Sequence, residues 1–261
     1  MQKALYRTPL TWFTAATVAI TTLASSNEGL AQSATPKAPA PSAGRAAQKP
    51  RTPEDAVTPA VKDPHRHAKF LERIKQGDID LLFLGDSITD GWPRSGERSW
   101  LKFAAYKPAN FGIGGDRTEH LLWRITNGEL DGIRPKLAVV MIGTNNIGHF
   151  ADEKPEWAAN GVKKILDTIH AKLPETKVLL LGVFPRGTSD SPQRKAVEEI
   201  NRIIANFADG KITRYLDIGK SFLDKDGNLP ADVMPDKLHP NAKGYDIWYQ
   251  AMHPVLDEMM R

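Results

Sequence analysis

After residue 64, short apolar runs alternate with longer amphipathic stretches, and this pattern leaves few folds open to the chain. Each run has the length of a strand and is almost continuously apolar, which is typical of strands buried on both faces of a sheet. Strands that alternate with helices predict a parallel sheet with helices on both faces. We therefore expect one α/β domain of three layers, α/β/α, with about five parallel strands at 80–84, 109–113, 137–142, 178–181 and 214–218.

The stretches between these runs repeat their apolar residues every three or four positions, which is the period of one helix face. We expect a helix before the first strand, helices between strands, and a closing helix at 242–260. The content of 41% hydrophobic and 25% charged residues is that of an ordinary globular protein. The apolar helix positions are Phe70, Leu71 and Ile74; Leu121, Leu122 and Ile125; Val162, Ile165, Leu166 and Ile169; and Val197, Ile200, Ile203 and Ile204.

The first 33 residues have the pattern of a signal peptide. Lys3 and Arg7 form a basic start, residues 10–24 are largely apolar, and Ala31 and Ser33 offer small side chains for cleavage. The apolar stretch is shorter than the roughly 20 residues that a membrane-spanning helix needs, so an uncleaved anchor is the weaker alternative. We expect a protein exported to the periplasm or secreted, with its mature chain beginning near Ala34.

Residues 34–64 differ sharply in composition from the rest of the chain. Seven of them are Pro and eight are Ala, with almost no large apolar side chain. Such a segment buries too little surface to offset the entropy lost on ordering, so we interpret it as a disordered Pro/Ala-rich linker. The predicted organisation is a signal peptide at 1–33, a linker at 34–64 and a single domain at 65–261.

Charge and cysteine content exclude several classes of function. The formal net charge is only +4 and no block of like charges occurs, so we expect no nucleic-acid partner. The chain has no Cys, which excludes disulfides, thiolate metal sites and a cysteine nucleophile. The His residues show no spacing typical of metal ligands, and we predict no metal and no cofactor. A catalytic nucleophile would therefore be an oxygen or a nitrogen.

Polar and Gly-rich residues gather where the predicted strands end. In open parallel sheets, ligands bind beyond these carboxyl ends. A serine hydroxyl needs a base within hydrogen-bond reach, and His239 can serve Ser87 in this way. Asp236 can accept the other imidazole N–H and fix the tautomer. The strand-end groups are Asp86 and Ser87; Gly114 and Gly115; Thr144, Asn145 and Asn146; and the loop residues Asp236 and His239.

Each of these groups also has a purely structural interpretation. Asp86 could bind nearby amides in a strand-ending turn, and Ser87 could cap the helix that follows. The two adjacent asparagines, Asn145 and Asn146, could form turns, and His239 could mark a helix start. Their joint order and spacing favour catalysis by Ser87, Asp236 and His239 over these alternatives, and we assign Asp86 a structural role.

Four blocks of sequence resemble the GDSL, or SGNH, esterase and lipase superfamily, and within it the catalytic subunits of the platelet-activating-factor acetylhydrolase branch. The resemblance spans roughly residue 80 to the C-terminus and implies a flavodoxin-like SGNH hydrolase fold. It also implies an oxyanion hole made by the Ser87 and Gly115 N–H groups and the Asn145 amide. The blocks are FLGDSIT at 83–89, NFGIGGD at 110–116, VMIGTNN at 140–146 and DKLHP at 236–240.

Three further residues are candidates for contacts with the substrate. Trp92 follows the nucleophile in sequence and could contact a substrate, although core packing is the plainer interpretation. Arg117 and Arg186 lie on loops after the second and fourth strands, where they could bind an anionic or sugar substrate or remain solvated.

The sequence thus predicts an exported serine esterase that removes short acyl groups through an acyl-serine intermediate. Acetyl is implied by the branch that the chain resembles, and export makes an O-acetylated carbohydrate a substrate to consider beside a phospholipid or another small ester. The alternatives are a lysophospholipase or thioesterase acting on longer chains, a non-catalytic glycan-binding surface protein, and a cytosolic enzyme. The branch contains dimers, so a homodimer is a further expectation, and no stable membrane insertion is expected after signal cleavage.

Overall fold

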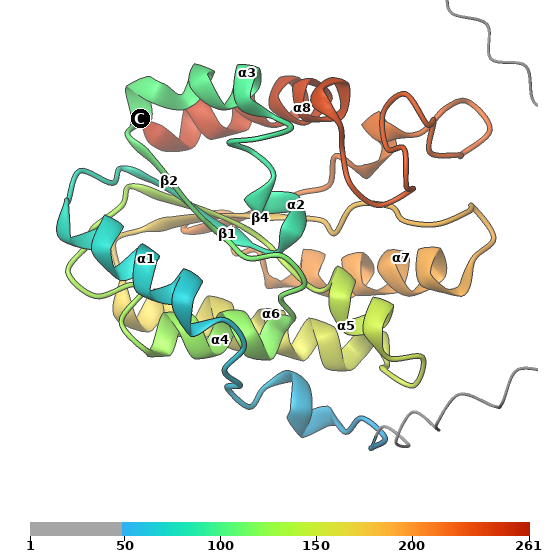
Figure 1. The fold of residues 1–261 in the computed structure, drawn as a ribbon, viewed down its shortest axis with the longest axis horizontal. Helices are drawn as coiled ribbons and strands as arrows, with labels where there is room; N and C mark the ends of the chain where they lie inside the picture. The colour runs from blue at the N-terminus through green and yellow to red at the C-terminus, as the bar shows by residue number, and fades with distance from the viewer. Residues whose placement is uncertain (1–48) are drawn as a thin grey trace, which may run out of the picture. The chain divides into compact units, whose positions relative to one another are not determined.

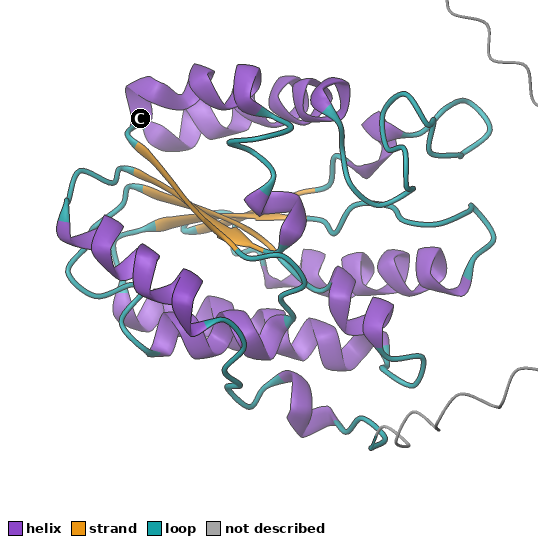
Figure 2. Cartoon of the chain, in the orientation of Figure 1, coloured by secondary structure: helices purple, strands orange, loops and turns teal. Residues whose placement is uncertain are grey.

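The computed structural model describes residues 49–261. The predicted signal peptide, and residues 34–48 of the predicted linker, lie outside the described residues. The described chain forms a five-stranded parallel sheet between two layers of helices (Figures 1 and 2). This α/β architecture confirms the predicted fold class. The strands are β1 (Leu81–Gly85), β2 (Pro108–Gly112), β3 (Leu137–Met141), β4 (Lys177–Leu181) and β5 (Thr213–Leu216).

The strand order is β2-β1-β3-β4-β5, and every neighbouring pair is parallel. This is the flavodoxin-like order, in which the chain moves from β1 to one side and then crosses back to the other. The loops that leave β1 and β3 therefore diverge at the carboxyl edge of the sheet. In folds of this order, ligands bind beyond the carboxyl ends of the strands at such a switch point.

Long helices follow the predicted periodicity, whereas short helical turns do not. Helices α1, α4, α6 and α7 contain the predicted apolar positions, and α8 has the predicted bounds. The short elements have too few turns for a period to be visible in sequence. The helices are α1 (Pro64–Lys75), α2 (Ser87–Asp90), α3 (Glu97–Trp100), α4 (Thr118–Thr126), α5 (Thr144–His149), α6 (Pro155–Lys172), α7 (Pro192–Ile204) and α8 (Ala242–Met260), with 3₁₀ turns η1 (Pro53–Ala56), η2 (Leu101–Tyr106), η3 (Ala205–Phe207) and η4 (Gly219–Phe222).

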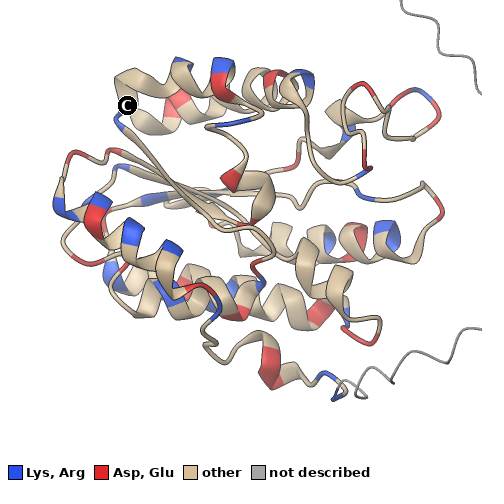
Figure 3. Ribbon diagram, in the orientation of Figure 1, with Lys and Arg blue, Asp and Glu red and all other residues tan. Residues whose placement is uncertain are grey.

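Two hydrophobic cores lie on the two faces of the sheet, because successive strand residues point to opposite faces. Leu82 and Leu84 of β1 pack with α1, α4, α6 and α7. Leu81 and Phe83 pack with α8 and with the segment that contains α2, α3 and η2. Figure 1 shows α3 and α8 on one side of the sheet and α1, α4 and α6 on the other. The ribbon segments of charged residues lie mainly on the helices and loops around this double core (Figure 3).

The structure corrects the prediction of a disordered linker for its last part. Residues 49–63 lie against the domain, and Ala56 in η1 is completely buried. The carbonyl of Ala56 accepts a hydrogen bond from the Thr118 hydroxyl at 2.9 Å. The prediction from composition was wrong here because polar contacts hold the segment in place. Such contacts do not depend on large apolar side chains. Among residues 49–261, the helices are too short or too polar to cross a bilayer.

Candidate active site

The turn after β1 presents Ser87 at the carboxyl edge of the sheet. Asp86 caps α2 by accepting a hydrogen bond from the Ile88 N–H at 3.0 Å, as its predicted structural role requires. A side chain at Gly85 would lie 2.5 Å from the Met141 carbonyl, so only glycine lets β1 and β3 approach here. Ser87 thus starts a helix on a tightly packed turn and is itself partly exposed.

His239 lies directly beside this serine. The Ser87 Oγ is 2.9 Å from His239 Nε2, and His239 Nδ1 is 2.6 Å from Asp236 Oδ2. With its Nδ1–H donated to the carboxylate, the imidazole presents the lone pair of Nε2 to the serine hydroxyl. The structure therefore brings Ser87 to the loop that carries Asp236 and His239, which lies far from it in sequence, in the arrangement that proton transfer from serine to imidazole needs.

A local turn gives the Asp236–His239 loop its shape. Oδ1 of Asp236 accepts hydrogen bonds from the Leu238 N–H at 3.0 Å and the His239 N–H at 2.7 Å, and Lys237 adopts φ 57°. Burial acts to raise the pKa of Asp236, but the hydrogen bonds from the His239 amide and ring outweigh it and lower that pKa. The carboxylate therefore stays ionised beside the imidazole. Both side chains are well exposed, 55% for Asp236 and 43% for His239.

Two backbone amides near Ser87 lie in the loop after β2. A Cβ placed on Gly114 would be 3.9 Å from the Ser87 Cβ, so this loop adjoins the nucleophile. Gly115 has φ +73°, a left-handed conformation that favours glycine. Among the described residues, neither the Gly114 nor the Gly115 N–H has a hydrogen-bond acceptor. The Gly115 amide, predicted to bind an oxyanion, is thus free to do so.

The two asparagines after β3 have different environments. Asn145 donates one N–H of its amide to the Asp116 carbonyl at 2.9 Å, which leaves the second N–H for another acceptor. Asn146 is completely buried, accepts from the Thr118 N–H at 3.1 Å and donates to Glu153 at 3.1 Å. Asn146 therefore ties three segments together, and Asn145 is the asparagine with a spare donor.

A buried ionic group supports the loop after β2. Arg124 is 2% exposed, donates to Asp116 at 2.9 Å and pairs with Glu129, which is completely buried. Burial raises the pKa of Asp116, although Arg124 and Lys62 oppose the shift. This group fixes Asp116, and the carbonyl of Asp116 in turn orients the Asn145 amide. Sequence reasoning missed these residues because a charge in the core gives no periodic signal.

Asp86, next to the nucleophile, is almost fully buried. Burial raises the pKa of Asp86 to about 7, against the opposing effect of its hydrogen bond from the Ile88 amide. Its carboxyl group therefore carries a proton over much of the range in which an isolated aspartate would be ionised.

Trp92 lies in the core, in agreement with the plainer interpretation of this residue and against a contact with substrate. Trp92 is completely buried, with ring centroids 4.9 Å from Tyr245 and 4.6 Å from Trp248. Helix α2 leads the chain from the partly exposed Ser87 back into the core, where Ile88 and Trp92 are buried. Trp92 therefore stabilises the packing of α8 beneath the site.

The two candidate arginines lie at the carboxyl edge in different settings. Arg117 pairs with Glu119 at 2.6 Å and lies 3.3 Å from the Nδ1 of His149. Arg186 donates to the Thr144 carbonyl at 2.7 Å and hydroxyl at 3.0 Å, and forms no ion pair with another described residue. Burial, followed by the charges of Arg117 and Arg186, lowers the pKa of His149. The two cations therefore act on a common imidazole.

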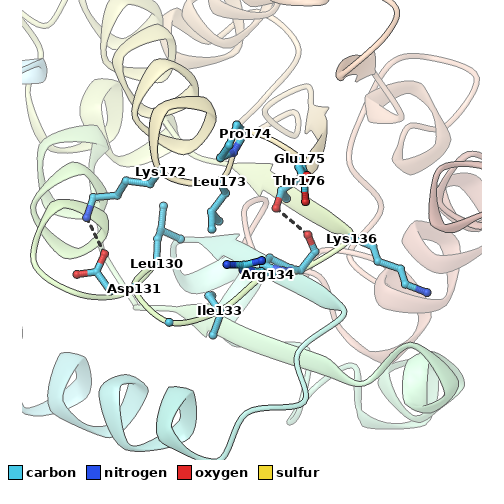
Figure 4. A pocket seen from close by; sticks show the side chains of 12 residues that line it. Leu130, Asp131, Ile133, Arg134, Lys136, Lys172, Leu173, Pro174, Glu175 and Thr176 are labelled. Atoms are coloured by element: carbon cyan, nitrogen blue, oxygen red, sulfur yellow. Dashed lines mark hydrogen bonds and ion pairs between the residues drawn. The ribbon is translucent and has the colours of Figure 1, made fainter.

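Hollows elsewhere on the described surface are separate from this site. One of about 840 Å³ lies at the amino ends of β3 and β4, lined by residues 130–136 and 172–176 (Figure 4). There Lys172 pairs with Asp131 at 2.7 Å, and the Thr176 hydroxyl donates to the Pro135 carbonyl at 2.7 Å. Hollows of about 480 and 390 Å³ also lack Ser87, Asp236 and His239. Within residues 49–261, no group of three His, Asp or Glu side chains is arranged to hold a metal ion.

Comparison with known proteins gives consistent matches. Residues 83–247 match the model of the GDSL-like Lipase/Acylhydrolase family. Platelet-activating factor acetylhydrolase IB subunit alpha1 from Homo sapiens is 35% identical over 192 residues, which cover 73% of this chain and 80% of the relative.

Solved structures of low sequence identity share the fold. A GDSL-like lipase from Bacteroides thetaiotaomicron, 19% identical, has a TM-score of 0.61 and covers 74% of this chain and 97% of its own. An acetylxylan esterase from Geobacillus stearothermophilus, 19% identical, has a TM-score of 0.56 and covers 70% of this chain and 94% of its own. These likenesses support the fold assignment.

Proposed function

The chain belongs to the GDSL-like lipase/acylhydrolase family and is an ester-hydrolysing enzyme, and from this membership we propose that it is an exported serine esterase that removes acetyl groups from O-acetylated carbohydrates. The observation that carries the proposal is the chain of contacts from Ser87 through His239 to Asp236. The serine is at hydrogen-bond distance from its base, and the base is oriented by a carboxylate, as nucleophilic acyl transfer requires.

In the proposed mechanism, the Ser87 hydroxyl attacks the ester carbonyl while Nε2 of His239 takes its proton. The imidazolium, stabilised by Asp236, returns this proton to the leaving alcohol as the carbon–oxygen bond of the ester breaks. A water molecule then attacks the acyl-serine, with His239 again acting as base, and releases the carboxylic acid and free Ser87.

Negative charge develops on the carbonyl oxygen in both steps. Donors that already point at this oxygen lower the barrier, and each is typically worth about 3 to 4 kcal/mol. The amides of Ser87 and Gly115 and the second N–H of Asn145 are the proposed donors. Two observations support this assignment. The Gly115 N–H has no acceptor among the described residues, and the Asp116 carbonyl holds the Asn145 amide in place.

Two considerations support acetyl esters of carbohydrates as the substrate. Relatives at about a third identity are named acetylhydrolases, and the same fold serves an acetylxylan esterase. His239 and Asp236 are also well exposed, as a site that accepts an ester on a bulky polymer requires. A polymeric carbohydrate would be met outside the cytoplasm, in agreement with the signal-peptide pattern of residues 1–33.

Hydrolysis of p-nitrophenyl esters by the full chain tests the activity. We expect turnover of the acetyl ester, a loss of about 10³-fold or more in Ser87→Ala and His239→Ala, and rates that decline from acetyl to butyryl to longer chains. A rate that rises with chain length would instead support a lysophospholipase or thioesterase. Wild-type activity in both variants would overturn the serine mechanism.

Acetate release from acetylated xylan and from a deacetylated control tests the carbohydrate part of the proposal. Export is tested separately, by fractionating cells of the source organism and sequencing the N-terminus of the protein. We expect a start near Ala34 in the periplasmic or secreted fraction, whereas an intact Met1 in the cytosol would contradict export.

A further inference from the structure

Residues 49–62, here called the strap, precede the region that matches the family model and lie against the loops of the active site. The Ala60 N–H donates to the Glu119 carbonyl at 3.0 Å, and the Ala56 carbonyl accepts from Thr118. Glu119 and Thr118 begin α4, directly after the loop that contains Gly114 and Gly115. The strap is therefore attached to the part of the chain that carries the proposed oxyanion donor.

Arg51 anchors the other end of the strap. Its guanidinium pairs with Glu119 at 3.0 Å and Glu153 at 2.6 Å, and lies 4.6 Å from the centre of the Phe150 ring. Both carboxylates are buried, so this arginine has fixed partners on α4 and on the segment between α5 and α6. With Arg51 held at one end, the direction of the strap is set and its last residues reach Gly114.

Lys62 is the strap residue that enters the active-site loop. Its ammonium donates to the Gly114 carbonyl and lies 3.4 Å from Asp116. It also lies 3.6 Å from the position that a Cβ on Gly115 would occupy. Asp116 already has Arg124 as a closer partner, at 2.9 Å. No other described side chain donates to the Gly114 carbonyl, so this contact depends on Lys62.

This carbonyl belongs to the same peptide group as the Gly115 N–H. In a planar trans peptide the C=O and the N–H point in opposite directions. The two residues that flank the group are both glycine, so rotation of the whole peptide meets little steric resistance. An ammonium that holds the carbonyl on one side therefore directs the N–H to the opposite side.

We propose that Lys62 is a positioning residue of the esterase: by binding the Gly114 carbonyl, it prevents rotation of the Gly114–Gly115 peptide and aims the Gly115 N–H at the oxyanion. The inference rests on the proposed function, because it needs Gly115 as an oxyanion donor. A hydrogen bond from a cation to the carbonyl also polarises the peptide and makes its N–H a stronger donor. The strap is then part of the catalytic unit.

The contact predicts a kinetic role with little effect on stability. The Lys62 side chain is 32% exposed, and its loss leaves the buried Asp116 paired with Arg124 at 2.9 Å, so folding should change little. Lys172 offers a matched control, because its side chain is 31% exposed and also pairs with one carboxylate, Asp131, but at the opposite end of the sheet (Figure 4). Lys62 and Lys172 should therefore differ in their effect on catalysis and resemble each other in their effect on stability.

The test compares Lys62→Met, Lys62→Arg and Lys172→Met in the full chain with p-nitrophenyl acetate. We expect Lys62→Met to lower kcat by about 10-fold, less than the loss of a direct oxyanion donor, with KM within about twofold of wild type. Lys62→Arg retains a donor, so on a logarithmic scale its kcat should lie at least midway between those of Lys62→Met and wild type. Lys172→Met should keep wild-type kcat, and all three should keep the wild-type Tm within a few degrees.

Affinity for a small alkyl boronic acid gives a second readout, since its adduct with Ser87 places an oxygen in the oxyanion hole. Lys62→Met should weaken this inhibitor by a factor similar to its loss in kcat. An unchanged kcat in Lys62→Met, with Ser87→Ala inactive, would overturn the inference and leave the esterase mechanism intact. A rise in KM alone would make Lys62 a substrate contact and also overturn it. Equal rates in wild type and Ser87→Ala would instead refute the proposed function.

Discussion

The two halves of the proposed active site are built in different ways. The loop with Asp236 and His239 is exposed and shaped by hydrogen bonds within four consecutive residues. The half that contains Gly115 and Asn145 rests on the buried Asp116 and Arg124 and depends on contacts between different segments of the chain. The difference indicates that the proton-transfer loop is encoded locally, whereas the oxyanion side is a product of the whole fold.

The difference also separates activity from stability. A substitution in the exposed loop removes a group that touches few other residues, so catalysis should suffer and folding should not. A substitution beneath the oxyanion loops leaves buried partners unpaired, so folding should suffer as well. Four measurements can break or sharpen this contrast.

The largest effect is expected for Asp236→Asn. The amide oxygen can still accept the two backbone hydrogen bonds, but Asn donates where Asp accepted, so His239 takes the wrong tautomer. We expect kcat for p-nitrophenyl acetate to fall by about 10³- to 10⁴-fold. The free energy of unfolding in urea should change by less than about 1 kcal/mol. A large loss of stability would show that this loop is not locally encoded.

Arg124→Met should have the opposite signature. It removes the buried partner of Asp116 and Glu129, and a buried charge without its partner costs about 3 to 5 kcal/mol. The midpoint of urea unfolding reports this loss. Arg202→Met, at an exposed ion pair with Glu199, is the control and should change stability by about 1 kcal/mol or less. Similar midpoints in the two variants would contradict the importance of the buried group.

The pH dependence of stability tests the burial of Asp86. Its pKa is about 7 in the folded protein against an ordinary value of 3.8. Between these values the folded protein keeps a proton that the unfolded chain has lost, so this residue makes stability fall as pH rises from about 4 to 7.

Asp86→Asn keeps the cap of α2 and cannot ionise, so the comparison isolates the titration. The free energy of unfolding of the variant, relative to that of wild type, should rise by up to about 4 kcal/mol as the pH increases across this range. Urea unfolding at several pH values measures this difference. A difference that is constant with pH would mean that Asp86 is ionised in the fold.

The smallest of the four effects is expected for Asn145→Ala. It removes one donor to the oxyanion, and we expect kcat to fall by about 10²-fold with a smaller change in KM. Asn146→Ala is the informative comparison, because its buried amide serves Thr118 and Glu153. It should lower the midpoint of urea unfolding, which Asn145→Ala should change less. If Asn146→Ala lowered kcat and Asn145→Ala lowered the midpoint, Asn146 would be the oxyanion donor and Asn145 the structural residue.

Much of the fold was predictable from residue order. The five apolar runs became the five strands with shifts of one or two residues at their ends, and the last helix spans Ala242–Met260 as expected. The sequence also predicts Ser87, Asp236 and His239 as a catalytic group, because their joint order and spacing are more specific than any one of them alone. Short elements such as α2 and α5 were missed, since one turn of helix shows no period.

The remaining errors share a physical cause. Sequence proximity to Ser87 makes Trp92 a candidate for the site, but the chain after α2 places it in the core beside Trp248. Composition predicts a linker for residues 49–62 because they lack large apolar side chains, yet hydrogen bonds and ion pairs hold them against α4. Sequence patterns report how much surface a segment can bury; they do not report which distant partner it meets.

The sequence by itself determined the parallel α/β fold, the strand ends that carry the polar groups, and the shape of the Asp236–His239 loop. These features follow from periodicity and from hydrogen bonds between near neighbours, which are fixed by residue order. Only the tertiary structure decided that Asn145 has a spare donor, that Asp116 and Arg124 lie together in the core, and that Lys62 reaches the Gly114 carbonyl. Those contacts join segments up to about fifty residues apart in the chain, and the packing of helices around the sheet sets them.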